Sequence, residues 1–157
     1  MKNFSLGLSL LVGLGVLMTA CGDSGSGSSC SSGQVDCDGT CIPEADSTLT
    51  WVQANVFDVH GCAASSCHDG QNPSPLEDLD LRTEQASFDT LVGVESSQAS
   101  PSVLVVASDS ESSYLMNKML GVGMADGTLL MPFGATSPLC DAKLDGVRAW
   151  IDAGATR

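Results

Sequence analysis

Apolar residues recur at helical spacing in the stretch that begins near residue 50. They stand four, three and four residues apart, so they share one face of a helix predicted over 51–59, which Thr48 or Thr50 can cap. This predicted stripe consists of Val52, Val56, Val59 and Ala63. The helix leads the chain directly to Cys62.

A second helical stripe lies near the C-terminus, where the boundaries are well marked. Ser137 suits the N-cap, Pro138 the first helical position and Gly154 the C-terminal end. The apolar positions again stand four, three and four residues apart, and they are Cys140, Leu144, Val147 and Ile151, with Trp150 beside them. This stripe is predicted to be buried in the core.

Shorter elements connect these two helices. The sequence predicts a short helix over 84–91 and another over 111–120, capped by Asp109 or Ser110. The apolar run 103–107 has the composition of an extended segment. Together these elements predict a mostly α domain of three to five helices, in which the first and last helices pack against each other.

The N-terminus has the pattern of an export signal. Lys2 precedes an apolar segment over 4–18, and the small residues Thr19 and Ala20 follow it. This order predicts a signal peptide over 1–20, which is too short to be a spanning helix.

The residues around the predicted cleavage site resemble a bacterial lipobox. The sequence Leu17-Met-Thr-Ala-Cys21 implies that Cys21 carries lipid, and the stretch 22–29, rich in glycine and serine, would then be a flexible tether. The alternative is an ordinary signal peptide followed by an unrelated cysteine. We expect an exported protein, lipid-anchored to the cell envelope, with a tether and small disulfide module over 21–47 and a main domain over 48–157.

The charge of the mature chain is strongly acidic. Cleavage after Ala20 removes Lys2 and leaves five basic against 19 acidic side chains. Nucleic acid is a poor partner for such a chain, because phosphate binding needs a basic face. A membrane reached through the lipid and a basic redox partner protein are the expected partners.

The cysteines divide into three groups. After Cys21, three stand close together at Cys30, Cys37 and Cys41. Three cysteines cannot all pair among themselves, so one must reach elsewhere, and Cys140 is the natural candidate. Zinc binding by this module is disfavoured, because it lacks a C-x-x-C pair and export implies an oxidising compartment.

The remaining two cysteines stand in the loop Cys62-Ala-Ala-Ser-Ser-Cys67-His68. Two cysteines followed by a histidine are the groups needed to attach a haem and ligate its iron, although the usual signal is C-x-x-C-H. The loop is also suited to a Cys62–Cys67 disulfide beside a surface histidine. One weaker alternative is a metal site formed by His60, His68 and Cys62. Another is a catalytic serine, Ser65 or Ser66 beside His68, for which no nucleophile elbow is present.

Several segments together resemble the c-type cytochrome domains of small exported bacterial lipoproteins. They are the helix leading into Cys62, the C-x4-C-H loop, the pair Met131-Pro132, and the terminal helix around Trp150. The resemblance covers about residues 50–155. It departs from the family pattern in the two additional residues between the cysteines.

The resemblance implies one covalent haem c and electron transfer rather than enzymatic catalysis. Cys62 and Cys67 would form thioethers to it, His68 would be the proximal iron ligand and Met131 the distal one. A His/Met pair raises the reduction potential and favours electron transfer. His60 is the reserve candidate for the iron. The alternative is a haemless, disulfide-stapled lipoprotein that uses the same scaffold as a binding or structural module.

Overall fold

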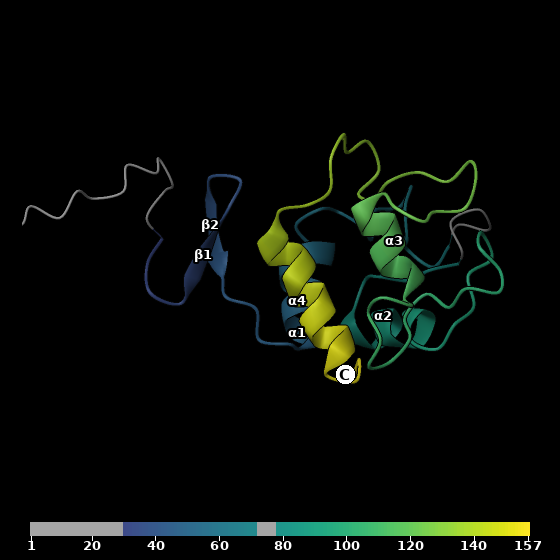
Figure 1. The fold of residues 1–157 in the computed structure, drawn as a ribbon, viewed down its shortest axis with the longest axis horizontal. Coiled ribbons are helices and arrows are strands. Elements are labelled where there is room, and N and C mark those ends of the chain that lie inside the picture. Colours follow the sequence, from purple (N-terminus) through teal and green to yellow (C-terminus); the bar gives the residue numbers. More distant parts are fainter. Residues whose placement is uncertain (1–29, 72–77) are drawn as a thin grey trace, which may run out of the picture.

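The computed structural model describes residues 30–71 and 78–157 (Figure 1). The predicted signal peptide, the predicted lipid attachment site Cys21 and the predicted tether lie outside the described residues. The described elements, in chain order, are β1 (Gln34–Cys37), β2 (Thr40–Pro43), α1 (Leu49–Val52), the π-helix η1 (Gln53–Phe57), α2 (Glu84–Leu91), α3 (Tyr114–Leu120) and α4 (Asp141–Asp152).

The fold is not the mostly α domain that the sequence predicts. Helix accounts for 30% of the described residues, and strands together with isolated bridges account for 13%. Much of the difference lies between α2 and α3, where isolated bridges pair Val92 with Val105 and Glu95 with Val103. Serine is frequent in this part of the sequence, which also contains Gly93 and Pro101, and these residue types favour turns over helix.

The helix α3 begins three residues later than predicted. Asp109 does not cap a helix at 111; its Oδ1 instead accepts a hydrogen bond from the Ser112 amide (3.0 Å), which makes a local turn. The Ser113 hydroxyl binds the amide of Val106 (2.8 Å) rather than a helical amide. The side chains in this stretch therefore stabilise a turn, and the helix starts only at Tyr114.

The N-cap predicted for the last helix is also wrong. Cys140, not Ser137, precedes the first helical residue, and its backbone angles (φ −57°, ψ 150°) lie outside the helical range. The buried stripe of this helix is confirmed, because Leu144, Val147 and Ile151 all lie in the core. By contrast, α2 begins as predicted after Thr83, whose Oγ1 accepts a hydrogen bond from the Ala86 amide.

The helix predicted over 51–59 is interrupted by a π-helical turn. Thr48 caps α1, as expected, but η1 follows after only one turn. A π-turn has more residues per turn than an α-helix, so it rotates the following side chains out of the predicted stripe. Val56 remains buried, whereas Val59 is 61% exposed. The predicted stripe is therefore correct at Val52 and Val56 and wrong at Val59, and Ala63 is partly buried against the core.

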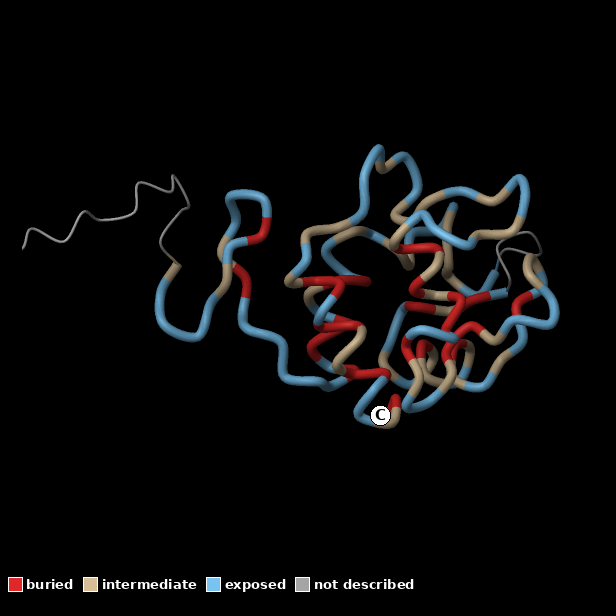
Figure 2. The backbone as a smooth tube through the Cα atoms, viewed as in Figure 1, coloured by how far each residue is buried: buried red, intermediate tan, exposed pale blue. Residues whose placement is uncertain are grey.

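The first and last helices pack together, as predicted (Figure 1). The indole of Trp51 on α1 lies against Gly146 on α4, where a Cβ would stand only 2.1 Å from its Cζ3. The indole Nε1 also donates a hydrogen bond to the Pro43 carbonyl (3.3 Å). Figure 2 shows that the buried backbone concentrates on these two helices and around α2 and α3.

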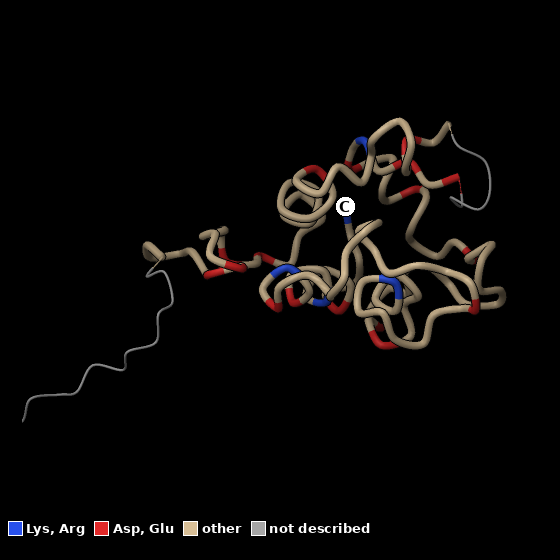
Figure 3. Tube along the Cα trace, turned by 90° about the horizontal axis from the view of Figure 1, so that it is seen from above, with Lys and Arg blue, Asp and Glu red and all other residues tan. Residues whose placement is uncertain are grey.

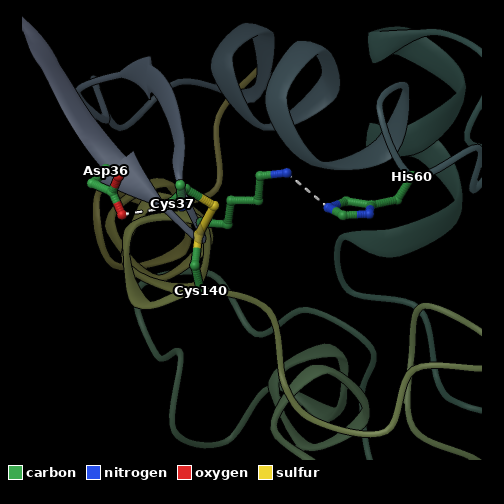
Figure 4. The surroundings of a disulfide bond; sticks show 6 residues. Asp36, Cys37, His60 and Cys140 are labelled. Carbon is green, nitrogen blue, oxygen red and sulfur yellow. Dashed lines mark hydrogen bonds between the residues drawn. A yellow bond between two sulfur atoms is a disulfide. The ribbon is translucent and has the colours of Figure 1, made fainter. Parts of the chain in front are cut away.

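The hairpin β1–β2 is joined to the main body by a disulfide. Its strands are antiparallel. Cys30 pairs with Cys41 within this module, and Cys37 pairs with Cys140 before α4 (Figure 4). The prediction that one module cysteine reaches Cys140 is confirmed.

Two global properties bear on the environment of the chain. The disulfides indicate an oxidising environment. Within residues 30–71 and 78–157, no helix has the length and apolar character needed to cross a membrane. Figure 3 shows acidic residues scattered over the trace and outnumbering the basic ones.

Candidate functional site

The loop from Cys62 to His68 is closed by its own backbone. The Cys62 amide donates to the Phe57 carbonyl (2.9 Å), which ties the start of the loop to the end of η1. The Cys67 amide donates to Ala64 (2.7 Å), and the His68 amide donates back to the Cys62 carbonyl (2.9 Å). The first cysteine and the histidine of the motif are therefore joined directly through their main chains.

Cys62 and Cys67 are both half-buried thiols. Burial raises the pKa of Cys62 to about 11, and the nearby charges of Cys67 and Asp58 add to this effect, against a smaller backbone hydrogen-bond contribution. A thiol with so high a pKa is a weak nucleophile near neutral pH. The high pKa therefore disfavours a role for Cys62 as a reactive thiol.

The backbone of His68 is fixed on its other side by the segment before α2. Its carbonyl accepts a hydrogen bond from the Leu81 amide (2.9 Å), and the Gly70 amide donates to Leu79 (2.8 Å). An isolated bridge joins Asp69 and Asp80 in the same place. The backbone amide and the backbone carbonyl of His68 are thus held by different parts of the chain.

A bidentate ion pair stabilises this segment. Arg82 donates through Nε to Asp80 Oδ1 (2.9 Å) and through Nη2 to Oδ2 (2.6 Å). These hydrogen bonds lower the pKa of the Asp80 carboxyl to about 2. The carboxylate is therefore charged at any physiological pH and stabilises the turn that supports His68.

Met131 comes from a different segment of the chain. Its amide donates to the Lys118 carbonyl on α3 (2.9 Å), and the preceding Leu130 lies near Gly121 at the end of that helix. The Tyr114 hydroxyl accepts a hydrogen bond from the Ala125 amide (3.2 Å) within the same loop. The half-buried methionine is therefore presented by a loop that folds back on α3.

Exposed apolar side chains are found in the same two segments. The large apolar residues of the described chain that are most exposed are Val59, just before the cysteine loop, and Val122, Leu129 and Phe133 on either side of Met131; Phe133 is 73% exposed. Apolar surface in these positions is suited to covering by an apolar group.

His60 contacts the side chain of Lys143 on α4. Its Nε2 lies 2.8 Å from the Lys143 Nζ, the contact drawn to His60 in Figure 4. Burial and the Lys143 charge both lower the pKa of His60, so the neutral ring accepts a hydrogen bond from the ammonium. This contact occupies one of the two ring nitrogens through which His60 could bind a metal.

The described residues contain one close group of three metal-type donors, and it consists of Cys37, Asp38 and Cys140. Two of its members form a disulfide, so it is not a metal site. The predicted alternative of His60, His68 and Cys62 as a metal site has no such convergence in this part of the chain.

The best-defined cavity of the described chain lies elsewhere. It has a volume of about 640 Å³ and includes none of the four residues predicted to hold a haem. It is bounded by the turn before α3, by α3 itself and by the end of α4, and its polar lining includes Asp109, Glu111, Arg148 and Asp152. Two of these groups have partners within the fold. Asp152 accepts a hydrogen bond from the Ser110 amide, and Arg148 donates one to Asp145.

Gln53 belongs to the site, although the sequence did not reveal it. Its side chain lies in the core, 7% exposed, between η1, Leu81 and α2. A lone glutamine within an apolar helical stretch was the only signal in the sequence.

The comparisons with family models, curated proteins and solved structures gave no match to this chain.

Proposed function

We propose that this protein is an exported electron carrier, lipid-anchored through Cys21, that holds one covalent haem c. Cys62 and Cys67 would hold the haem through thioethers, His68 would ligate the iron through its imidazole, and Met131 through its sulfur. With this ligation the group supplies reversible one-electron transfer at a raised reduction potential. The proposal concerns the site and does not rely on the mostly α fold, which the structure contradicts.

The observation that carries the proposal is the state of the cysteine loop. Four cysteines form two disulfides, while Cys62 and Cys67 keep their thiols in one loop with His68. The main chain of this histidine is fixed from two sides. The donor set, two thiols, an imidazole and a thioether, is the set that a covalent haem requires.

Three further observations support it. The exposed apolar side chains flank both the loop and Met131, where a haem would cover them. The raised pKa of Cys62 disfavours a competing role as a reactive thiol. The acidic surface favours a basic redox partner.

A second candidate is a haemless lipoprotein that serves as a binding or structural module. The Cys37–Cys140 disulfide favours it, because this bond staples the hairpin to the main body across 103 residues without any cofactor. In that case the loop cysteines would form a third disulfide.

The test is expression of the full chain together with a haem-maturation system. After denaturation, haem absorbance and haem mass are expected to stay with the polypeptide. The Cys62→Ala/Cys67→Ala variant should lose both, whereas Cys30→Ala/Cys41→Ala, which also removes two cysteines, should keep them. A colourless chain with a Cys62–Cys67 disulfide would refute the electron carrier and support the second candidate.

The lipid anchor is tested separately. Cys21→Ser is expected to move the protein from the membrane fraction to the soluble fraction of lysed cells, with no change in the haem bound per chain. A variant that stays in the membrane fraction would remove Cys21 as the anchor.

A further inference from the structure

The carboxamide of Gln53 makes three hydrogen bonds inside the core. Its Nε2 donates to the Leu81 carbonyl (2.8 Å) and to Asp58 Oδ1 (2.7 Å). Its Oε1 accepts from the Ser87 hydroxyl on α2 (2.8 Å). Both amide hydrogens of the side chain are therefore used, and each one reaches a different segment.

The two residues bound by the amide nitrogen, Asp58 and Leu81, lie next to the two ends of the cysteine loop. Asp58 begins the turn before Cys62, since its carbonyl accepts from the Gly61 amide (3.1 Å). Leu81 follows the loop in space, since its amide donates to the His68 carbonyl (2.9 Å). A single side chain thus connects the start of the loop with its histidine end.

The π-turn explains how Gln53 comes to stand there. The Asp58 amide donates to the Gln53 carbonyl five residues earlier (2.9 Å), which is the hydrogen bond of a π-turn. Gln53 therefore contacts Asp58 through both its main chain and its side chain. Turns of this kind are frequent at functional sites, where they aim a particular side chain.

We infer that Gln53 is a positioning residue for the Cys62–His68 loop, and that its amide nitrogen holds the loop in the shape in which Cys62, Cys67 and His68 are presented together. The inference rests on the proposed function for one point only, namely that the loop serves to hold a haem. The hydrogen bonds themselves do not depend on a haem. The contact with Ser87, by contrast, joins Gln53 only to α2 and offers a matched control.

The test uses the haem-free full chain and three variants. Gln53→Met keeps the size of the side chain and removes all three hydrogen bonds, whereas Ser87→Ala removes only the one to α2. Asp58→Ala is added because Asp58 is exposed and its loss leaves the core intact. Amide hydrogen exchange of the loop and of α4 is followed by mass spectrometry.

In Gln53→Met, exchange in peptides spanning 58–68 and 79–82 is expected to speed up about tenfold, as for the loss of one buried hydrogen bond, with little change in α4. Asp58→Ala should speed up amide exchange in 58–62 and leave amide exchange in 79–82 unchanged. Ser87→Ala should spare the loop. Uniform acceleration across the chain, or equal loop effects in Gln53→Met and Ser87→Ala, would overturn the inference and leave Gln53 as an ordinary core residue.

The alkylation rate of Cys62 gives a second readout, compared among the same three variants. Cys62 is half-buried, so the closed loop limits access of the reagent to its sulfur. Opening of the loop in Gln53→Met should raise the rate about tenfold, in step with amide exchange, whereas Ser87→Ala should leave it unchanged. An unchanged rate would count against the inference. Because no haem is present, failure of this test is separate from failure of haem attachment.

Discussion

The contact between α1 and α4 allows a stability prediction that is worked from a single glycine. Gly146 faces the indole of Trp51, and a Cβ at position 146 would stand 2.1 Å from Cζ3 and 2.7 Å from two neighbouring ring atoms. Real contacts of a Cβ are never so close, so Gly146→Ala must displace the ring or the helix. The ring is 5% exposed and hydrogen-bonded to Pro43, so it has little room to move.

Two opposing terms set the size of the effect. Alanine is the better helix former by about 1 kcal/mol. Overpacking of a filled core costs about 1–3 kcal/mol, and a contact this short belongs at the upper end. We therefore expect Gly146→Ala to lower the free energy of unfolding by about 2 kcal/mol.

The assay is urea unfolding of the disulfide-intact chain, followed by tryptophan fluorescence. The midpoint should fall while the slope with urea is unchanged. In a Trp51→Leu background, where the ring is absent, the same substitution should be neutral or stabilising, and the difference between the two backgrounds measures the clash. Equal costs in both backgrounds, or a stabilised single variant, would refute the reasoning.

Three other predictions follow from particular bonds. Removing the 103-residue link with Cys37→Ala/Cys140→Ala should cost about 4–5 kcal/mol of stability in urea unfolding, and a loss below about 1 kcal/mol would mean that the hairpin contributes little to the unfolding transition. The pKa of Asp80 is lowered in the fold to about 2, so its contribution is present above pH 4 and lost as the pH falls toward 2; the unfolding midpoint should therefore drop less over this range in Asp80→Asn than in the wild type, and parallel curves would contradict this. In the haem-loaded protein, Met131→Ala should abolish the absorption band of the sulfur–iron bond and lower the reduction potential, and an unchanged spectrum would reject Met131 as the ligand.

Local signals in the sequence were sufficient for part of this fold. The start of α2 is set by the Thr83 hydroxyl and the three residues that follow, so it was predicted correctly. The stripe of α4 was also correct, because spacing along one helix needs no knowledge of other elements. The Cys37–Cys140 bond was anticipated in part by the odd number of cysteines in the N-terminal module.

Elements that depend on distant contacts were not predictable in the same way. The π-turn leaves no pattern in the residue types, and it moved Val59 from the predicted stripe to the surface. The start of α3 was missed because Asp109 is equally suited to an N-cap and to the turn that it makes with Ser112. The role of Gln53 could not be found, because it depends on Leu81 and Ser87, about 30 residues further along the chain.

The same contacts explain how the Cys62 thiol can remain beside two disulfides in one chain. Thiol–disulfide exchange requires a thiolate, and with a pKa of about 11 only about one Cys62 in ten thousand is ionised at pH 7. The loop that desolvates this sulfur is closed by the bond from His68 to Cys62 and supported through Gln53. Folding of the loop therefore slows attack by Cys62 on the structural disulfides. A protein that used this pair for disulfide chemistry would need the opposite arrangement, a solvated loop with a lowered pKa at one cysteine.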